Sequence, residues 1–301
     1  MPVVQTSQLT KAYGVKFALQ NADLAVHEGD IFGIVGKNGA GKTTLMKLIL
    51  GITEPTDGEI ALFGSKDIFQ QRQRIGALIE APGFFPYMTA EQNLEYFRLL
   101  RGIAEKESVT EVLRLTGLAD ERNKPFRAFS TGMKQRLGIA LALMGEPDLL
   151  LLDEPTNGID AQGIVQVRQL LQKLNQERQI TIMISSHILS ELAQIANRFV
   201  IMDQGLIINS VTKEALNDST RTAIRLRTDA PERVVVVLEE HFGITDYQVE
   251  NDKDVLLFES FAQIPEIVRA LVLSDIRIYA VHKQDTELED YFLQQIGASY
   301  V

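Results

Sequence analysis

One glycine-rich segment limits the folds open to this chain more than any other feature. Residues 36–44 read Gly-Lys-Asn-Gly-Ala-Gly-Lys-Thr-Thr, which fits the pattern GxxxxGK[ST] in full. An apolar run at residues 31–35 precedes the segment, and Leu45, Leu48 and Ile49 follow it at helical spacing. Between a strand and a helix, glycines let successive backbone amides point inward and bind phosphate together with the positive end of the helix. The segment therefore predicts a strand–loop–helix unit that binds a nucleoside polyphosphate, and a glycine-rich turn that binds nothing is the alternative.

The residues of this loop have separate expected roles. Lys42 supplies a mobile cation for the outer phosphates, and the hydroxyl of Thr43 suits a Mg²⁺ ion that bridges them. Side chains at Gly36, Gly39 and Gly41 would fill the phosphate cradle. The remaining predicted nucleotide contacts in the loop are Asn38, Ala40 and Thr44. The motif indicates an NTPase without saying which one.

Composition and charge narrow the class of protein. The 301 residues suffice for one large α/β domain and a smaller one, and 45% of them are apolar, as in ordinary globular proteins. No apolar run approaches the length of about 18 residues that spans a bilayer, and the N-terminus lacks a signal-peptide pattern, so we expect a cytoplasmic protein. The net charge of −10 disfavours broad binding to nucleic acid. Without cysteine, the chain has no disulfides or thiolate metal sites.

Two predicted strands end in polar side chains that can carry chemistry. Residues 149–152 are four leucines followed by Asp153 and Glu154, and residues 180–184 are followed by Ser-Ser and His187. Because parallel α/β sheets bind ligands at the carboxyl ends of their strands, we expect these side chains beside the phosphate loop. There Asp153 would hold Mg²⁺, Glu154 would be the general base for a water molecule, and His187 would hydrogen-bond the terminal phosphate. A buried strand that merely ends in acids and a structural histidine are the alternatives.

Capping residues predict the starts of further helices. Thr89 and Ser108 each begin a helix in an insertion at about residues 76–148. Ser130, with the flexible Gly132 after it, opens another helix that could bind a second phosphate, although any capped helix begins in this way.

Two more residues are candidates for nucleotide contacts. Tyr13 lies in a predicted loop ahead of the phosphate-binding strand, where its ring would stack on a purine; a partly buried loop tyrosine is the alternative. Asp160 is the expected cap of the helix that follows the turn after Glu154.

Together these elements resemble the nucleotide-binding subunit of an ABC transporter over about residues 2–210. The resemblance rests on their order along the chain: Tyr13, the phosphate loop, residues 130–135, the Asp153-Glu154 pair with Asp160, and His187. It implies that two such domains pair head to tail, so that Ser130 and the Gly132 amide bind the ATP held by the partner's phosphate loop. ATP binding would close the pair, and hydrolysis assisted by Glu154 and His187 would reopen it.

The chain departs from the family pattern in two places. Residues 129–133 read Phe-Ser-Thr-Gly-Met where the family has Leu-Ser-Gly-Gly-Gln. Glu80, in the stretch Ile-Glu-Ala-Pro-Gly-Phe-Phe-Pro, stands where the family ordinarily has a glutamine that touches the metal. A carboxylate can bind Mg²⁺ but adds negative charge near the terminal phosphate, so we expect a changed metal dependence; an exposed glutamate without contacts is the alternative. Both stretches resemble the branch that contains bacitracin-resistance and lantibiotic-immunity ATPases.

The expected fold class is α/β: an ABC-type P-loop ATPase domain at residues 1–215, with a helical subdomain at about 76–148, and a small C-terminal α+β domain at 216–301. In the C-terminal part the predicted elements follow the order βαββαβ, which is typical of a ferredoxin-like domain, with a closing helix at about residues 288–296. It carries no catalytic constellation, so we expect a dimer contact or a regulatory role.

The resemblance implies a Mg²⁺-dependent ATPase subunit of an ABC exporter, acting through a separate membrane permease, with antimicrobial peptides as suggested substrates. The chain would lie in the cytoplasm at the inner face of the cell membrane and be bound to the membrane only indirectly. It would pair with a second ATPase domain; we expect a homodimer, and a heterodimer is the alternative. No nucleic-acid partner is expected. The alternative is a non-transport ABC ATPase that acts on ribosomes or DNA, but the second ATPase domain or long coiled coil that such proteins generally carry is not visible.

Overall fold

The computed structural model describes residues 1–80, 83–219, 221–251, 253–284 and 288–298. They form two compact units. The first contains Met1–Lys213 and the C-terminal residues from Phe292 on, and the second is Glu214–Tyr291.

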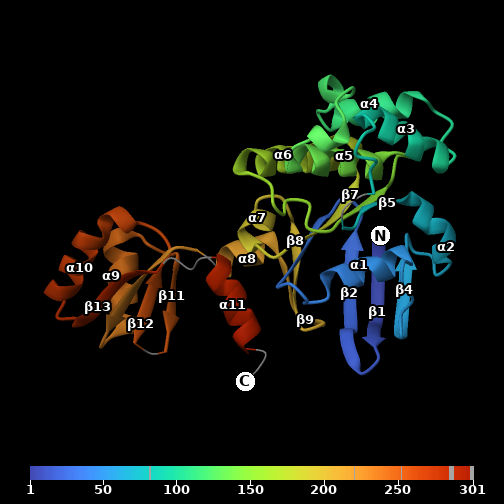
Figure 1. The fold of residues 1–301 in the computed structure, drawn as a ribbon. Coiled ribbons are helices and arrows are strands. Elements are labelled where there is room, and N and C mark those ends of the chain that lie inside the picture. Colours follow the sequence, from blue (N-terminus) through green and yellow to red (C-terminus); the bar gives the residue numbers. More distant parts are fainter. Residues whose placement is uncertain (81–82, 220, 252, 285–287, 299–301) are drawn as a thin grey trace. The chain divides into compact units, whose positions relative to one another are not determined.

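A six-stranded sheet forms the centre of the first unit (Figure 1). Its strands lie in the order β5 (Ile75–Leu78), β6 (Leu149–Leu152), β7 (Thr181–Ser186), β3 (Ile31–Gly36), β8 (Arg198–Asp203) and β9 (Leu206–Thr212). The first five strands are parallel, and β9 runs antiparallel to β8. Strands β3, β6 and β7 are buried along their whole length, as expected for continuous apolar runs inside a parallel sheet.

Helix α1 (Lys42–Leu50) is the structural link between this sheet and a second one. The second sheet is antiparallel, in the order β2 (Lys16–His27), β1 (Pro2–Tyr13) and β4 (Asp57–Leu62). Leu45, Met46, Leu48 and Ile49 of α1 are fully buried in one core with residues of both sheets. Burial on opposite sides fixes the helix, and with it the loop at its N-terminus.

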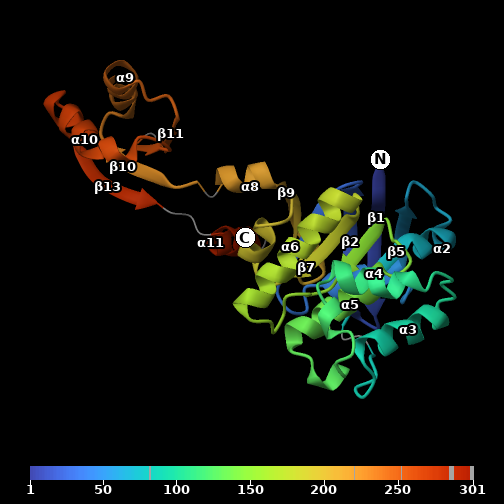
Figure 2. The same ribbon diagram turned by 90° about the horizontal axis from the view of Figure 1, so that it is seen from above.

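The insertion between β5 and β6 is helical. Its helices α3 (Ala90–Leu100), α4 (Glu107–Leu115) and α5 (Thr131–Leu143) lie side by side in Figures 1 and 2, and the short elements are η2 (Ala119–Glu121) and η3 (Phe126–Ala128). The predicted start at Thr89 is confirmed, and Thr89 forms a capping box with Gln92. The Ser108 cap is wrong: α4 already begins at Glu107, and the Ser108 hydroxyl donates to the Glu105 carbonyl instead, at 2.7 Å.

The other helices of the first unit lie outside this insertion. They are α2 (Ile68–Gln71) with η1 (Arg72–Arg74), α6 (Ala161–Arg178), α7 (Leu189–Ala193) and the helix α11 (Leu288–Ala298), whose residues from Phe292 on belong to this unit. Gln295 of α11 accepts a hydrogen bond from Asn209 of β9 at 2.7 Å. No helix in the described part of the chain is long and apolar enough to cross a bilayer.

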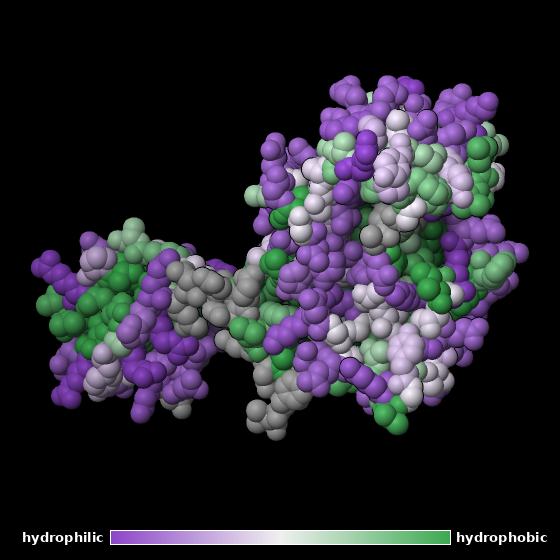
Figure 3. All heavy atoms as spheres, in the orientation of Figure 1, coloured by the Kyte–Doolittle hydropathy of each residue, from purple (hydrophilic) through white to green (hydrophobic). Residues whose placement is uncertain are grey.

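The second unit has the predicted βαββαβ order after a first helix, α8 (Lys213–Ser219). Its elements are β10 (Ala223–Thr228), α9 (Pro231–Phe242), β11 (Tyr247–Glu250), β12 (Asp254–Leu257), η4 (Phe261–Gln263) with α10 (Ile264–Leu273), and β13 (Ile278–Gln284). The sheet order β11-β12-β10-β13, antiparallel throughout, confirms the ferredoxin-like topology. Figure 3 shows a hydrophobic patch over α9 and α10, where Val236, Val272 and Leu273 are exposed.

Candidate nucleotide-binding site

The carboxyl ends of the parallel strands bring together several residues that the sequence singled out and one, Gln204, that it did not. β3 leads into the glycine-rich loop, β6 into Asp153 and Glu154, β7 into His187, and β8 into a turn with Gln204. Because these strands are parallel neighbours in register, their carboxyl ends lie on one edge of the sheet. This edge is where open α/β sheets bind ligands.

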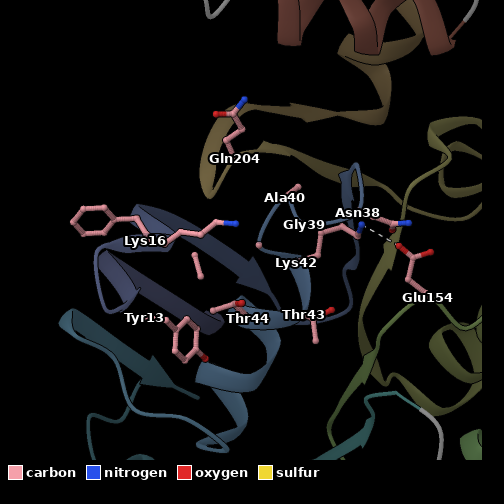
Figure 4. Close-up of a pocket in the computed structure, with 13 residues that line it drawn as sticks. Tyr13, Lys16, Asn38, Gly39, Ala40, Lys42, Thr43, Thr44, Glu154 and Gln204 are labelled. Atoms are coloured by element: carbon pink, nitrogen blue, oxygen red, sulfur yellow. Dashed lines mark ion pairs between the residues drawn. The ribbon is translucent and has the colours of Figure 1, made fainter.

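A cavity of about 730 Å³ lies over the glycine-rich loop (Figure 4). Such a volume is within the range of pockets for small molecules and cofactors. Of the predicted site residues, the cavity brings together Tyr13, Asn38, Gly39, Ala40, Gly41, Lys42, Thr43, Thr44 and Glu154. Its other lining residues, Lys16, Phe17, Ala18 and Gln204, were not found from the sequence.

Close packing explains the glycines at two positions of the loop. Gly41 has a φ of +104°, in the left-handed region, and a Cβ atom there would lie 2.6 Å from the Ala18 carbonyl oxygen. A Cβ atom on Gly36 would lie 2.6 Å from the Met202 carbonyl oxygen. The loop therefore packs against the backbones of β2 and β8 at distances that leave no room for a side chain.

Lys42 is held at the inner end of the cavity. Its side chain is only 5% exposed, and its ammonium donates to the carbonyl oxygens of Gly36 at 2.6 Å and of Lys37 at 3.3 Å. The same ammonium lies 3.0 Å from Glu154 Oε1, an ion pair drawn as the dashed line in Figure 4. A cation in this position can exchange its carboxylate partner for a phosphate.

Glu154 joins the loop to β7. Its Oε2 lies 2.7 Å from Nδ1 of His187, which donates when it carries the proton. Its backbone has a φ of +49°, and its N–H donates to the hydroxyl of Ser185 at 2.9 Å. A positive φ is strained for a glutamate, so the contacts around Glu154 must hold its backbone in this conformation.

Asp153 accepts hydrogen bonds on both carboxylate oxygens. The Thr43 hydroxyl donates to Oδ2 at 2.6 Å, and the buried Ser185 hydroxyl donates to Oδ1 at 2.6 Å. Ser185 thus anchors both acids of the pair, a role that the sequence indicated only by a polar residue at the end of an apolar strand.

The donors at Thr43 and Asp153 fit a magnesium ion. They are oxygens, which hard cations prefer, and they lie in contact at the base of α1. Among the described residues no group of three or more His, Cys, Asp or Glu could hold a metal by itself. A Mg²⁺ ion here would complete its shell with water molecules and with the phosphate oxygens of a nucleotide.

Glu80 makes a different contact. It follows β5 with a φ of +61°, its side chain is 67% exposed, and its Oε1 accepts a hydrogen bond from Lys47 of α1 at 2.7 Å. This hydrogen bond raises the pKa of Lys47 above its ordinary value. The reading of Glu80 as a loop residue without contacts is thus wrong, because a lysine compensates its charge. Residues 81–82 of the same stretch lie outside the described residues.

Ser130, Gly132 and Asp160 are not among the residues that line the cavity. Ser130 and Asp160 are confirmed as helix caps: their side chains accept hydrogen bonds from the backbone N–H groups of Met133 and Gly163. A Cβ atom on Gly132 would lie 3.2 Å from Ile159 Cγ2. Tyr13 does line the cavity and is 55% exposed, but it ends strand β1 instead of lying in a loop.

Comparison with known proteins also indicates a nucleotide-binding protein. The family model described as ABC transporter matches residues 19–157. The bacitracin transport ATP-binding protein BcrA of Bacillus licheniformis is 38% identical over 302 residues, which is 99% of this chain and 99% of that protein. The lantibiotic transport ATP-binding protein SrtF of Streptococcus pyogenes is 37% identical over 206 residues, 68% of this chain and 89% of its own.

Solved structures agree in fold. A dimeric ATP-binding cassette in a post-hydrolysis state, bound to ADP and Pi, covers 70% of this chain and 98% of its own with a TM-score of 0.63 and 26% identity. The structure of cbiO1 from Clostridium perfringens, part of the ABC transporter complex cbiONQ, covers 79% of this chain and 95% of its own with a TM-score of 0.65 and 25% identity. The predicted fold class is confirmed.

Proposed function

This chain belongs to the ABC transporter ATP-binding family, whose members bind and hydrolyse ATP, and we propose that Glu154 is its general base, positioned by His187 and released by Lys42. The observation that carries the proposal is the contact of Glu154 with both partners at the inner end of the cavity. An incoming triphosphate attracts the Lys42 ammonium, and the Glu154 carboxylate then keeps its hydrogen bond to His187. In that state it can accept a proton from a water molecule beside the terminal phosphate.

The other residues of the cavity bind ATP. Tyr13 stacks on the adenine, and the backbone amides of the loop with the hydroxyl of Thr44 hold the phosphates. Thr43 and Asp153 would hold Mg²⁺, and the ion when bound would supply positive charge against the phosphates. Ser130, Gly132 and Asp160, which lie outside the cavity of their own chain, meet the nucleotide of a second ATPase domain in a dimer. The dimeric state of the related cassette supports this assignment.

Glutamine in place of Glu154 tests the catalytic assignment. A general base contributes about 10²–10⁴-fold, so Glu154→Gln should lower the ATPase rate by at least about 100-fold and still bind ATP. Glu177→Gln, an exposed acid on α6, is the matched control and should keep the rate. A Glu154→Gln rate within tenfold of the original chain would exclude the assignment.

Glu80 would give the enzyme an unusual metal dependence. Glu80 now accepts a hydrogen bond from Lys47. If it exchanged this contact for the Mg²⁺ ion of bound MgATP, its carboxylate would stand where the family ordinarily has a neutral glutamine. Glu80→Gln should then shift the Mg²⁺ concentration that gives half-maximal ATPase activity. An identical Mg²⁺ titration for both proteins would remove Glu80 from the metal site.

The substrate of the transporter is an antimicrobial peptide exported through a separate permease, and the chain works as a homodimer at the inner face of the cell membrane. Support comes from the two relatives, which are named for bacitracin and lantibiotic transport. To test this, the Glu154→Gln chain is trapped with MgATP in a bacterial host, and proteins that co-purify from solubilised membranes are identified by mass spectrometry. A polytopic membrane protein supports the proposal, and ribosomal or DNA-associated proteins without a permease contradict it.

A further inference from the structure

Two turns close the cavity at the end away from Glu154. The β1–β2 turn brings Tyr13, Lys16 and Phe17, and the β8–β9 turn brings Gln204. In Figure 4 the Lys16 side chain extends across the cavity toward the glycine-rich loop. All four residues lie outside the segment matched by the family model.

Backbone contacts fix these turns against the loop. Tyr13 and Lys16 pair directly across the β1–β2 hairpin, so their side chains are neighbours. The N–H of Gly205 donates to the Ala40 carbonyl at 3.0 Å, and the Gly205 carbonyl accepts from the N–H of Gln20 at 2.8 Å. The β8–β9 turn therefore ties the phosphate loop to β2, the strand that begins at Lys16.

The charges that line the cavity make Lys16 distinctive. The lining residues include two cations, Lys16 and Lys42, and one acid, Glu154. Lys42 is paired with Glu154 and with two loop carbonyls. Lys16 is exposed, and within the described residues it has no hydrogen bond or ion pair from its side chain. Its charge is therefore available to an anionic ligand.

The position of Lys16 along the cavity indicates which part of a bound nucleotide its ammonium would contact. Lys42, beside Glu154, marks the outer phosphates, and Tyr13 marks the base. Lys16 is the neighbour of Tyr13 and extends toward the loop, so it faces the region between base and outer phosphates. We propose that Lys16 is a second cation of the nucleotide site and that it binds the α-phosphate. This inference rests on the placement of ATP in this cavity under the proposed function.

Binding measurements with two nucleotides test the proposal. The α-phosphate is common to triphosphate and diphosphate, so Lys16→Met should raise the Kd of AMP-PNP and of ADP by the same factor. A partly exposed charge-assisted hydrogen bond predicts a factor of roughly five to thirty. Both nucleotides are titrated into the purified full chain by calorimetry. Lys16→Arg, which keeps the charge, should restore most of the affinity.

The control is Lys66→Met, which removes another exposed lysine, one that pairs with Glu59 away from the cavity. It should leave both Kd values unchanged. If Lys16→Met leaves both values unchanged as well, or weakens AMP-PNP alone, the assignment to the α-phosphate is overturned. Lys42→Ala separates the two levels of inference: if that variant binds both nucleotides normally, the placement of ATP itself is wrong, whatever Lys16 does.

Discussion

Removal of the Ser185 hydroxyl should cost the first unit a measurable part of its stability. The side chain is fully buried, it donates to Asp153 Oδ1 at 2.6 Å, and it accepts from the N–H of Glu154 at 2.9 Å. A hydrogen bond to a charged group contributes about 1.5–3 kcal/mol and a neutral one about 0.5–1.5 kcal/mol. Ser185→Ala should therefore lower the free energy of unfolding by about 2–4 kcal/mol.

Urea unfolding measures this cost. With a denaturant slope of about 2.5 kcal/mol per molar of urea, a loss of about 3 kcal/mol lowers the midpoint by roughly 1 M. The matched control is Ser186→Ala, because the neighbouring hydroxyl is also buried but only accepts one hydrogen bond, from the N–H of Ile188 at 3.1 Å. It should cost about 1 kcal/mol.

The same variant tests whether Ser185 positions the site. Asp153 and Glu154 lose their common anchor, so the ATPase rate of Ser185→Ala should fall by roughly tenfold or more, whereas Ser186→Ala should change it little. If the two variants have the same unfolding midpoint, Ser185 does not link the two acids as its hydrogen bonds indicate.

Two further predictions concern backbone and charge. Gly41→Ala should lose nucleotide binding and about 1–3 kcal/mol or more of stability, because the added methyl group meets the Ala18 carbonyl. The control is Gly39→Ala, since Gly39 also has a positive φ but has open space around it. In a thermal melt this control should lose less stability. In the second unit, hydrogen bonds led by that from Arg227 hold the pKa of Asp254 below its ordinary value, and the Asp254 side chain is only 3% exposed. A lowered carboxyl pKa stabilises the fold above the unfolded-state value of about 3.9, and this stability is lost as the pH falls further. Asp254→Asn should lower stability at pH 7 and lose that acid dependence; equal pH profiles of unfolding for both proteins would contradict the assignment.

The residues predicted for phosphate binding, metal binding and catalysis could be found from the sequence because each follows a local pattern. The glycine-rich loop has its own motif, and Asp153, Glu154 and His187 follow apolar strands whose carboxyl ends share one edge of the sheet. The pairing of Glu154 with Lys42 follows from that shared edge. The ferredoxin-like order was readable for the same reason, since strands and helices alternate with clear turns between them.

The residues that were missed depend on contacts between distant segments. Lys16 and Phe17 lie in an ordinary hairpin, and Gln204 lies in a turn that approaches the loop only after β8 has joined the sheet beside β3. No short-range pattern marks such positions. The Lys47 partner of Glu80 depends in the same way on how α1 packs beside the end of β5, which periodicity alone does not give.

The β8–β9 turn also determines when the cavity can form during synthesis of the chain. Its Gly205 bonds to Ala40 in the phosphate loop and to Gln20 in β2, so the cavity needs segments from both ends of the first unit. During synthesis the ribosome releases the phosphate motif early, but the wall that contains Gln204 follows more than a hundred residues later. The complete cavity is therefore available to ATP only after β8 and β9 have emerged, so stabilisation by a ligand that fills it comes late in synthesis.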